Sequence, residues 1–392
     1  MSVRARIAII SQRYGSVGGG ERFAQEVTDR IAAKGEFEFH VLATAWESKC
    51  DLITFHRVPR LKFPRFLRPW FYGWWVGRMI AKGNFDLVHS HSGTAHADVY
   101  STHGAPHEFW TREVLGRRPK LIDRMMIALE RRMLAAAAPK VFMPVSSHLT
   151  RVYESVYGSL PGRWKVVHPG VDFAQFDQAG KTAARTEVRE RYGIAHDAFV
   201  VLFVGMNFQS KGLEKVIRAV ESVRQQRPEV AVHLLVVGRG DERRFAQIAA
   251  EVGCAAAVSF AGAQKAKIER YYAASDVLLM PATFETFCMV VLEGMAAGLP
   301  VIITDKMGVR DLVTDGVQGL VLTGGGSAAE SVVATTAALM QVMDPRVRTR
   351  MGAAGRETAR RQSWERVAAE VEQVYRDRLI LRKVFNGKGK TS

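Results

Sequence analysis

The chain has 392 residues, which is long enough for two or three domains. Of these residues, 47% are hydrophobic and 24% are charged, so the chain is too apolar to be disordered throughout. Its net charge of +16 indicates an anionic partner such as a nucleic acid, an anionic lipid or a phosphorylated substrate. The three cysteines are far apart, which disfavours a disulfide framework or a zinc site. No apolar run is long enough for a membrane span or a secretory signal. We therefore expect a cytoplasmic protein.

The N-terminal part of the chain alternates between strand and helix patterns. Residues 6–11 are a short apolar run typical of a buried strand, and a loop ending in three glycines at 18–20 follows it. A helix over 21–34 and a strand over 38–43 complete a βαβ unit, which belongs to a parallel sheet. Further strands are predicted at 85–90, 98–103 and 140–146, and helices at 119–138 and 147–157.

A second alternating series begins near Phe199. We therefore predict an α/β protein with two Rossmann-like domains facing a cleft. The last helix is expected to run from Ser363 to about Lys383. In this second series the predicted strands are 199–205, 232–238, 258–262, 276–281, 300–304 and 319–322, and the predicted helices are 211–226, 241–252, 265–274, 287–297, 328–343 and 346–361.

Two glutamates stand close to the predicted strand at 276–281. Glu285 lies in the loop after this strand, and Glu293 lies about two turns into a helix that starts near Phe287. The carboxyl edge of a parallel sheet is where α/β folds bind ligands, and the free N–H groups of a helix start bind anions. A sugar, a phosphate and a ribose can share such a loop and helix. The alternative is a surface helix with two solvated acids.

The spacing of these glutamates resembles the E-x7-E signature of the GT-B glycosyltransferases of family 4. Gly-Met-Ala-Ala-Gly-Leu-Pro-Val follows Glu293, as in that family. The likeness runs from residue 6 to about residue 376, and within the family it is greatest to the lipopolysaccharide-core glucosyltransferases. Four more stretches resemble family motifs in the same order: Gly18-Gly-Gly-Glu21, Val166-Val-His-Pro-Gly-Val-Asp172, Phe203-Val-Gly205 to Lys211-Gly212, and Ala274-Ser-Asp-Val-Leu-Leu-Met-Pro281.

The resemblance implies that different parts of the chain form domains with different roles. Residues 1–175 would form an acceptor-side Rossmann-like domain, and residues 176–365 a nucleotide-sugar-binding one. Residues 366–392 would form a helix that crosses back to the first domain, followed by a basic tail.

The resemblance also implies roles for single residues. Glu285 would bind the donor sugar, Lys211 would neutralise the diphosphate, and His103 would face the reacting sugar, so these three are the predicted catalytic residues. Glu293 would bind the ribose. Since no D-x-D sequence occurs, neither a metal nor another cofactor is expected. The other predicted donor contacts are Gly19, Gly20, Gly205, Gly262, Ala263, Phe287, Cys288, Met289 and Val290.

Three positions depart from the family pattern. Residues 206–210, which end in Ser210, lack the arginine that the family often has before the lysine, so one diphosphate contact is either missing or supplied by another group such as Arg13 or Arg310. Phe287 and Cys288 stand where the family usually has a glycine, two or three residues after the first glutamate. His103 stands where the lipopolysaccharide-core subgroup has an aspartate.

A basic and aromatic stretch remains outside these motifs. Residues 57–82 hold seven Lys/Arg, seven aromatic residues and no acid, and residues 112–140 hold eight basic and three acidic residues. Trp and Tyr favour membrane interfaces, and cations favour anionic headgroups. We expect both stretches to contact an anionic membrane surface. The alternatives are an ordinary helix with its aromatics in the core, and a nucleic-acid surface, which we do not expect because no nucleic-acid motif accompanies it.

These expectations combine into one hypothesis. The protein is predicted to be a retaining hexosyltransferase that moves glucose from a UDP-sugar to a lipid-linked saccharide such as lipopolysaccharide core. It would act as a peripheral protein on the inner face of the cytoplasmic membrane. One alternative is a mannosyltransferase that uses GDP-mannose for a glycolipid or exopolysaccharide, and another is a nucleotide- or RNA-binding module without activity.

Overall fold

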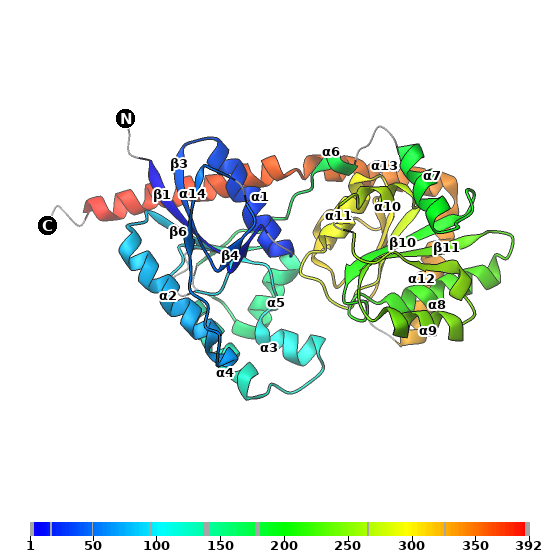
Figure 1. Cartoon of the computed structure of the whole chain (residues 1–392), viewed down its shortest axis with the longest axis horizontal. Coiled ribbons are helices and arrows are strands. Elements are labelled where there is room, and N and C mark those ends of the chain that lie inside the picture. Colours follow the sequence, from blue (N-terminus) through cyan, green and yellow to red (C-terminus); the bar gives the residue numbers. More distant parts are fainter. Residues whose placement is uncertain are drawn as a thin grey trace. The chain divides into compact units, whose positions relative to one another are not determined.

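The structure is a computed structural model that describes residues 4–15, 18–48, 50–94, 96–135, 141–160, 162–176, 181–264, 266–324 and 327–388. The chain divides into two compact units (Figure 1). Unit 1 holds the residues up to Gly170 and those from Trp364 onward, and unit 2 holds Val171–Ser363. Unit 1 is therefore built from both ends of the chain.

A parallel sheet forms the centre of unit 1. Ile7, Ile9 and Ile10 of its central strand are fully buried, as expected for a strand covered on both faces. Along the described chain this sheet has seven strands in the order β5 (Ile53–Arg57), β3 (Phe37–Ala43), β1 (Ala5–Ile10), β6 (Leu87–Ser90), β7 (Val99–Thr102), β8 (Val141–Pro144) and β9 (Arg163–Trp164), with β2 (Arg13–Tyr14) and β4 (Ala45–Trp46) paired separately.

The C-terminal helix packs against α1 and β6 within unit 1. Trp364 and Tyr375 on this helix are fully buried, and the Trp364 ring lies 5.9 Å from that of Phe23 on α1. The helix extends to Lys388, beyond the predicted end near Lys383. The helices of unit 1 are α1 (Gly19–Ala33), α2 (Arg68–Gly83), α3 (His107–Phe109), α4 (Leu121–Ala135), α5 (Ser147–Tyr157) and α14 (Trp364–Lys388), with a 3-10 turn at Arg65–Leu67 and a π-helical turn at Trp110–Val114.

Helix α2 has one buried face and one exposed face. Tyr72 and Val76 are buried against β1, β3 and β6. Trp70 and Trp74, one turn apart, are 39% and 58% exposed. The aromatic stretch is thus an amphipathic helix whose tryptophans lie partly outside the core.

Unit 2 has its own parallel sheet. Its central strand β10 pairs with β11 and β13, and residues 199–203 of β10 are buried. Because both sheets are parallel and flanked by helices, the predicted α/β fold with two Rossmann-like domains is confirmed. Within the described residues the second sheet has six strands in the order β12 (Val258–Phe260), β11 (Val232–Arg239), β10 (Phe199–Met206), β13 (Val277–Met280), β14 (Val301–Thr304) and β15 (Gly319–Leu322).

The helices of unit 2 follow the predicted pattern from α8 onward except at α10, whereas α6 and α7 lie in a stretch where no helix is predicted. A helix is predicted over 265–274, but α10 is confined to Glu269–Ala273, and Lys267 just before it has a positive φ of 66°. A helix cannot pass through that left-handed residue. The helices are α6 (Phe173–Phe176), α7 (Lys181–Arg191), α8 (Leu213–Gln226), α9 (Glu242–Glu251), α10, α11 (Met289–Ala296), α12 (Ala328–Met343) and α13 (Pro345–Arg361), with 3-10 turns at Ala255–Ala257 and Gly308–Leu312.

Candidate functional site

Lys211 and Glu285 meet beyond the carboxyl ends of β10 and β13. The Nζ atom of Lys211 is paired with Oε1 of Glu285, and the two side chains are 17% and 21% exposed. The backbone of Glu285 is fixed on both sides, because its N–H donates to the carbonyl of Lys306 (3.1 Å) and its carbonyl accepts from the N–H of Gly308 (2.9 Å). The structure therefore brings together two of the three predicted catalytic residues.

Lys211 carries a stable positive charge. Burial alone would lower the pKa of Lys211, but negative charge on Cys288, when that thiol ionises, and on Glu285 raises it, and the net shift is upward. Burial raises the pKa of the Cys288 thiol to about 12, although Lys211 opposes that shift. Cys288 is thus a neutral thiol at pH 7, and the carboxylate of Glu285 is what holds the ammonium group.

A tight turn presents Lys211. Asn207 and Gly212 have positive φ angles of 63° and 80° at the two ends of this turn. A Cβ atom on Gly212 would lie 2.5 Å from the carbonyl oxygen of Pro281, so only glycine fits there. Gly205, at the end of β10, packs against the Lys211 stem, since a Cβ there would lie 3.3 Å from Cγ of the lysine. The turn fixes the lysine relative to the strand ends.

Glu293 has a hydrogen-bond partner on another helix that the sequence does not predict. It lies on α11, is only 8% exposed, and accepts a 2.9 Å hydrogen bond from the hydroxyl of Tyr272 on α10. Tyr272 is itself fully buried. This tyrosine is absent from the predicted site because no spacing rule connects two residues on different helices that are 21 positions apart.

Cys288 has a left-handed backbone conformation, which glycine adopts more easily than other residues. Its φ and ψ are 85° and 75°, and it caps α11, which begins at Met289 rather than near Phe287. A left-handed conformation costs a non-glycine residue about 1–2 kcal/mol. Phe287 is buried, and its carbonyl accepts from the N–H of Val309 (2.9 Å), which anchors the loop. The first-turn N–H groups of Met289 and Val290 have no acceptor inside the helix, so this end attracts anions.

Gly262 and Ala263 lie just after β12. Gly262 has a φ of 67°, and its carbonyl accepts from the N–H of Gly238 at 2.8 Å. A Cβ atom on Gly262 would meet nothing within 4 Å, so the space beside it is open. Ala263 is exposed. Neither Gly262 nor Ala263 therefore blocks the space beside the end of β12 that a planar base would need.

The remaining predicted residues lie in unit 1, where Gly19 and Gly20 open α1 beside His103. A Cβ atom on Gly20 would lie 3.0 Å from Cγ of His103. The His103 ring stacks on that of His91 with centroids 5.3 Å apart, and their Nε2 and Nδ1 atoms are 3.0 Å apart. Burial lowers the pKa of His103 to about 4, so the ring is neutral at pH 7.

The departures at 206–210 acquire a structural setting. The carbonyl of Ser210 accepts from the N–H of Thr283 (3.4 Å), which ties the lysine turn to the loop that carries Glu285. Arg310 donates to the carbonyl of Val313, and Arg13 is exposed in unit 1. Their suggested role as substitutes for the missing arginine stays a prediction. Across the described residues, no group of three or more His, Cys, Asp or Glu side chains is placed to hold a metal ion.

Comparison with known proteins identifies the family. The model described as "Glycosyl transferases group 1" matches residues 184–358, and that described as "Glycosyltransferase Family 4" matches residues 17–175. A protein of Streptomyces avermitilis is 30% identical over 77% of this chain and 67% of its own length. The chain belongs to the group 1 and family 4 glycosyltransferases. The Streptomyces protein and one from Thermobifida fusca, 26% identical over 93% of this chain and 90% of its own length, are both named D-inositol 3-phosphate glycosyltransferase.

Solved structures show the same fold as this glycosyltransferase. WaaG, a glycosyltransferase involved in lipopolysaccharide biosynthesis, matches with a TM-score of 0.78 and 24% identity over 94% of this chain and 99% of its own. Anabaena HepE, solved in complex with UDP-glucose, matches with a TM-score of 0.71 and 17% identity over 95% of this chain and 99% of its own.

Proposed function

We propose that this glycosyltransferase moves a hexose, with glucose as the first candidate, from a UDP-sugar to a hydroxyl of a lipid-linked saccharide such as lipopolysaccharide core. It would retain the anomeric configuration and need no metal. The observation that carries the donor half of this proposal is the Lys211–Glu285 pair beside the N-terminus of α11.

The donor chemistry follows from the charges of this site. Negative charge grows on the departing diphosphate in the transition state, and Lys211 and the first-turn N–H groups of α11 would stabilise it. Glu285 orients the ammonium group and offers a carboxylate to the sugar hydroxyls. Glu293, held by Tyr272, would accept hydrogen bonds from the ribose.

His103 would act as a neutral group. With a pKa of about 4, it cannot serve as an acid at pH 7, but it can form a hydrogen bond with the reacting sugar. Family resemblance implies retention of the anomeric configuration without a clear enzymic nucleophile. We therefore propose that His103 positions the donor sugar.

The membrane part of the proposal rests on the exposed face of α2. Trp70, Trp74 and Arg78 follow one another at helical spacing, and Phe63 just before the helix is 83% exposed. On α4, Leu121 and Ile122 are 75% and 58% exposed. Exposed aromatic and basic side chains together suit the headgroup region of an anionic bilayer. Among the described residues, no helix has both the length and the apolar content needed to cross a membrane.

Calorimetry with UDP-glucose, UDP-galactose, UDP-N-acetylglucosamine and GDP-mannose, without added metal, tests the donor half. UDP-glucose is the first choice because a protein of the same fold has been solved with it. We expect one UDP-sugar to bind and Glu293→Ala to abolish that binding. Preference for GDP-mannose would favour the mannosyltransferase alternative, and failure of every sugar nucleotide to bind would refute the proposal.

A second acceptor class is favoured by the relatives. Proteins 26% and 30% identical to this chain are named D-inositol 3-phosphate glycosyltransferases, so a small phosphorylated polyol is a candidate acceptor. Transfer assays with D-inositol 3-phosphate and with delipidated core saccharide, each with the donor selected above, separate the two acceptors. Product with only the inositol phosphate would replace the first acceptor by the second.

A further inference from the structure

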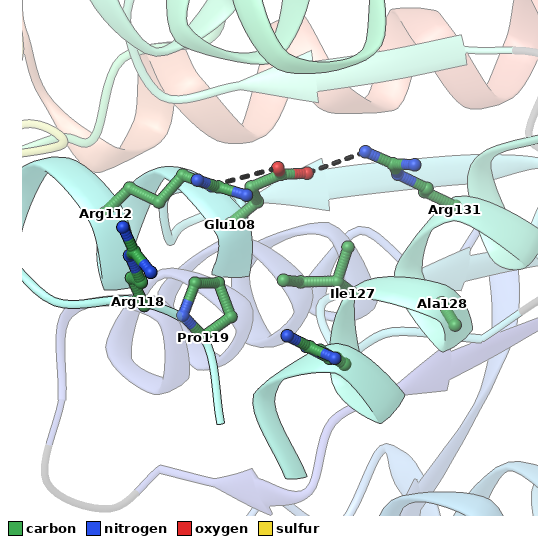
Figure 2. Close-up of a pocket in the computed structure, with 8 residues that line it drawn as sticks. Glu108, Arg112, Arg118, Pro119, Ile127, Ala128 and Arg131 are labelled. Atoms are coloured by element: carbon green, nitrogen blue, oxygen red, sulfur yellow. Dashed lines mark hydrogen bonds and ion pairs between the residues drawn. The ribbon is translucent and has the colours of Figure 1, made fainter. Parts of the chain in front are cut away.

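A pocket of about 440 Å³ in unit 1 is lined mainly by arginines. It lies between α4 and the segment from α3 to Pro119, and four guanidinium side chains surround it, from Arg112, Arg118, Arg124 and Arg131. Glu108 is the acid that lines it (Figure 2). The lining thus carries three more positive than negative charges.

The arrangement of these charges differs from that of an ordinary solvated helix face. Glu108 lies between Arg112 and Arg131 in Figure 2 and binds both, at 3.2 Å and 2.7 Å. In the described part of the chain, neither Arg118 nor Arg124 has an acidic partner. Two guanidiniums are therefore oriented by an internal carboxylate, and two more remain available to an external anion.

Two neighbouring acids, Asp123 and Glu130, are engaged by other residues. Asp123 accepts hydrogen bonds from Arg117 and from His107, and Glu130 accepts from the hydroxyl of Tyr157 and from the N–H of His107. Neither acid lines the pocket, and the residues that bind them, Arg117, His107 and Tyr157, also lie outside its lining.

The apolar part of the lining, which we call the floor of the pocket, is formed by Pro119, Ile127 and Ala128. Arg124, Ile127, Ala128 and Arg131 recur at the spacing of one helix face. Ala128 is the smallest of these lining side chains, and the volume falls in the range of small-molecule sites rather than that of a bare ion. The occupant must therefore combine an anionic group with a body of about the size of a sugar ring.

We propose that this pocket binds a phosphomonoester carried on a sugar-sized group. Guanidinium groups bind phosphate oxygens in a bidentate manner, and a surplus of three charges suits a dianion better than a diester monoanion. The ester can come from a soluble sugar phosphate or from a phosphorylated group at a membrane surface. This inference does not rest on the transferase proposal, because its readout is binding alone.

Calorimetry of the full chain with glucose 6-phosphate tests the pocket. Saturating UDP is present to occupy the donor site, and glucose and glucose 6-sulfate serve as comparison ligands. We expect saturable one-to-one binding of the phosphate, no binding of glucose, and at least tenfold weaker binding of the sulfate. Equal affinity for phosphate and sulfate would overturn the assignment to phosphomonoesters.

Two variants separate a pocket from a generally basic surface. Arg118→Gln/Arg124→Gln removes two charges that lack an acidic partner among the described residues, and Ala128→Phe fills the floor without changing charge. Each should weaken binding at least tenfold. The matched control Arg346→Gln/Arg350→Gln removes two exposed arginines from α13 in unit 2 and should change affinity less than twofold. Unchanged affinity in Ala128→Phe would refute the pocket.

Vesicles identify the source of the ester. Cosedimentation compares vesicles of phosphatidylcholine with 20% phosphatidic acid, a monoester, and with 20% phosphatidylglycerol, a diester. Binding to phosphatidic acid alone, lost in Ala128→Phe, assigns the pocket to a membrane ligand, whereas glucose 6-phosphate binding without that preference assigns it to a soluble one. If neither ligand binds, the proposal is wrong, while the donor calorimetry shows independently whether the transferase proposal stands.

Discussion

The hydroxyl of Tyr272 offers the sharpest test of how the donor site is built. Its 2.9 Å hydrogen bond to Glu293 is made between two buried side chains. A hydrogen bond to a charged group contributes about 1.5–3 kcal/mol to stability. Tyr272→Phe should therefore destabilise the protein by about 2 kcal/mol, which lowers Tm by about 4–8 °C for a unit of this size.

The neighbouring residue supplies a matched control. Tyr271 is also buried, but its hydroxyl is 3.3 Å from the neutral hydroxyl of Tyr192. Tyr271→Phe should cost about 0.5–1.5 kcal/mol, as for a neutral hydrogen bond. Scanning calorimetry of the full chain measures both changes, and titration with the preferred UDP-sugar measures affinity, which should fall only in Tyr272→Phe.

A double-mutant cycle with Glu293→Gln isolates the pair. A coupling free energy of about 1 kcal/mol or more between Tyr272→Phe and Glu293→Gln would show that the two groups act through each other. If Tyr272→Phe costs no more than Tyr271→Phe and leaves the donor affinity unchanged, Tyr272 does not hold Glu293 and the argument fails.

Three further predictions follow from the same geometry. Lys211→Met should lower kcat by about 10²–10³-fold with a smaller change in KM, because it removes charge stabilisation from the leaving group. A rise in KM with kcat unchanged would contradict that role. Burial lowers the pKa of His103 from 6.5 to about 4. Between these two pH values the His103 ring takes up a proton in the unfolded chain but not in the folded chain, which favours unfolding as the pH falls. Urea titrations should show stability falling across that window, and less steeply in His103→Asn. Gly20→Ala should reduce transfer by displacing His103, whereas Gly73→Ala, whose Cβ meets nothing within 4 Å, should stabilise α2 by about 0.5–1 kcal/mol; equal activities would place Gly20 outside the site.

The sequence predicts the sheets and most helices because their signals are local. The apolar run of β10 and the spacing of Val216, Ile217 and Val220 on α8 need no information from elsewhere in the chain. The shortness of α10 escapes this approach, because the left-handed backbone at Lys267 leaves no mark on periodicity.

The candidate site is predictable only as far as motifs reach. The sequence shows the spacing of Glu285 and Glu293, and it shows the glycine and lysine of the turn. The structure adds that Lys211 pairs with Glu285. Tyr272 becomes visible only when two helices are packed together. The arginine pocket is a similar case: the basic count over residues 112–140 shows an excess of charge, but not which arginines an internal acid already binds.

The discontinuity of unit 1 has a consequence for how the chain is made. Its first 170 residues leave the ribosome early, but Trp364 and Tyr375, which cover Phe23 and hydrogen-bond His89, are synthesised only after all of unit 2. Until then the nascent unit exposes an apolar surface that aggregation or chaperones can reach. Domains generally fold from the N-terminus onward during synthesis, but here unit 2 can complete its fold before unit 1. A gene truncated before residue 364 should therefore yield an intact unit 2 attached to an aggregation-prone unit 1.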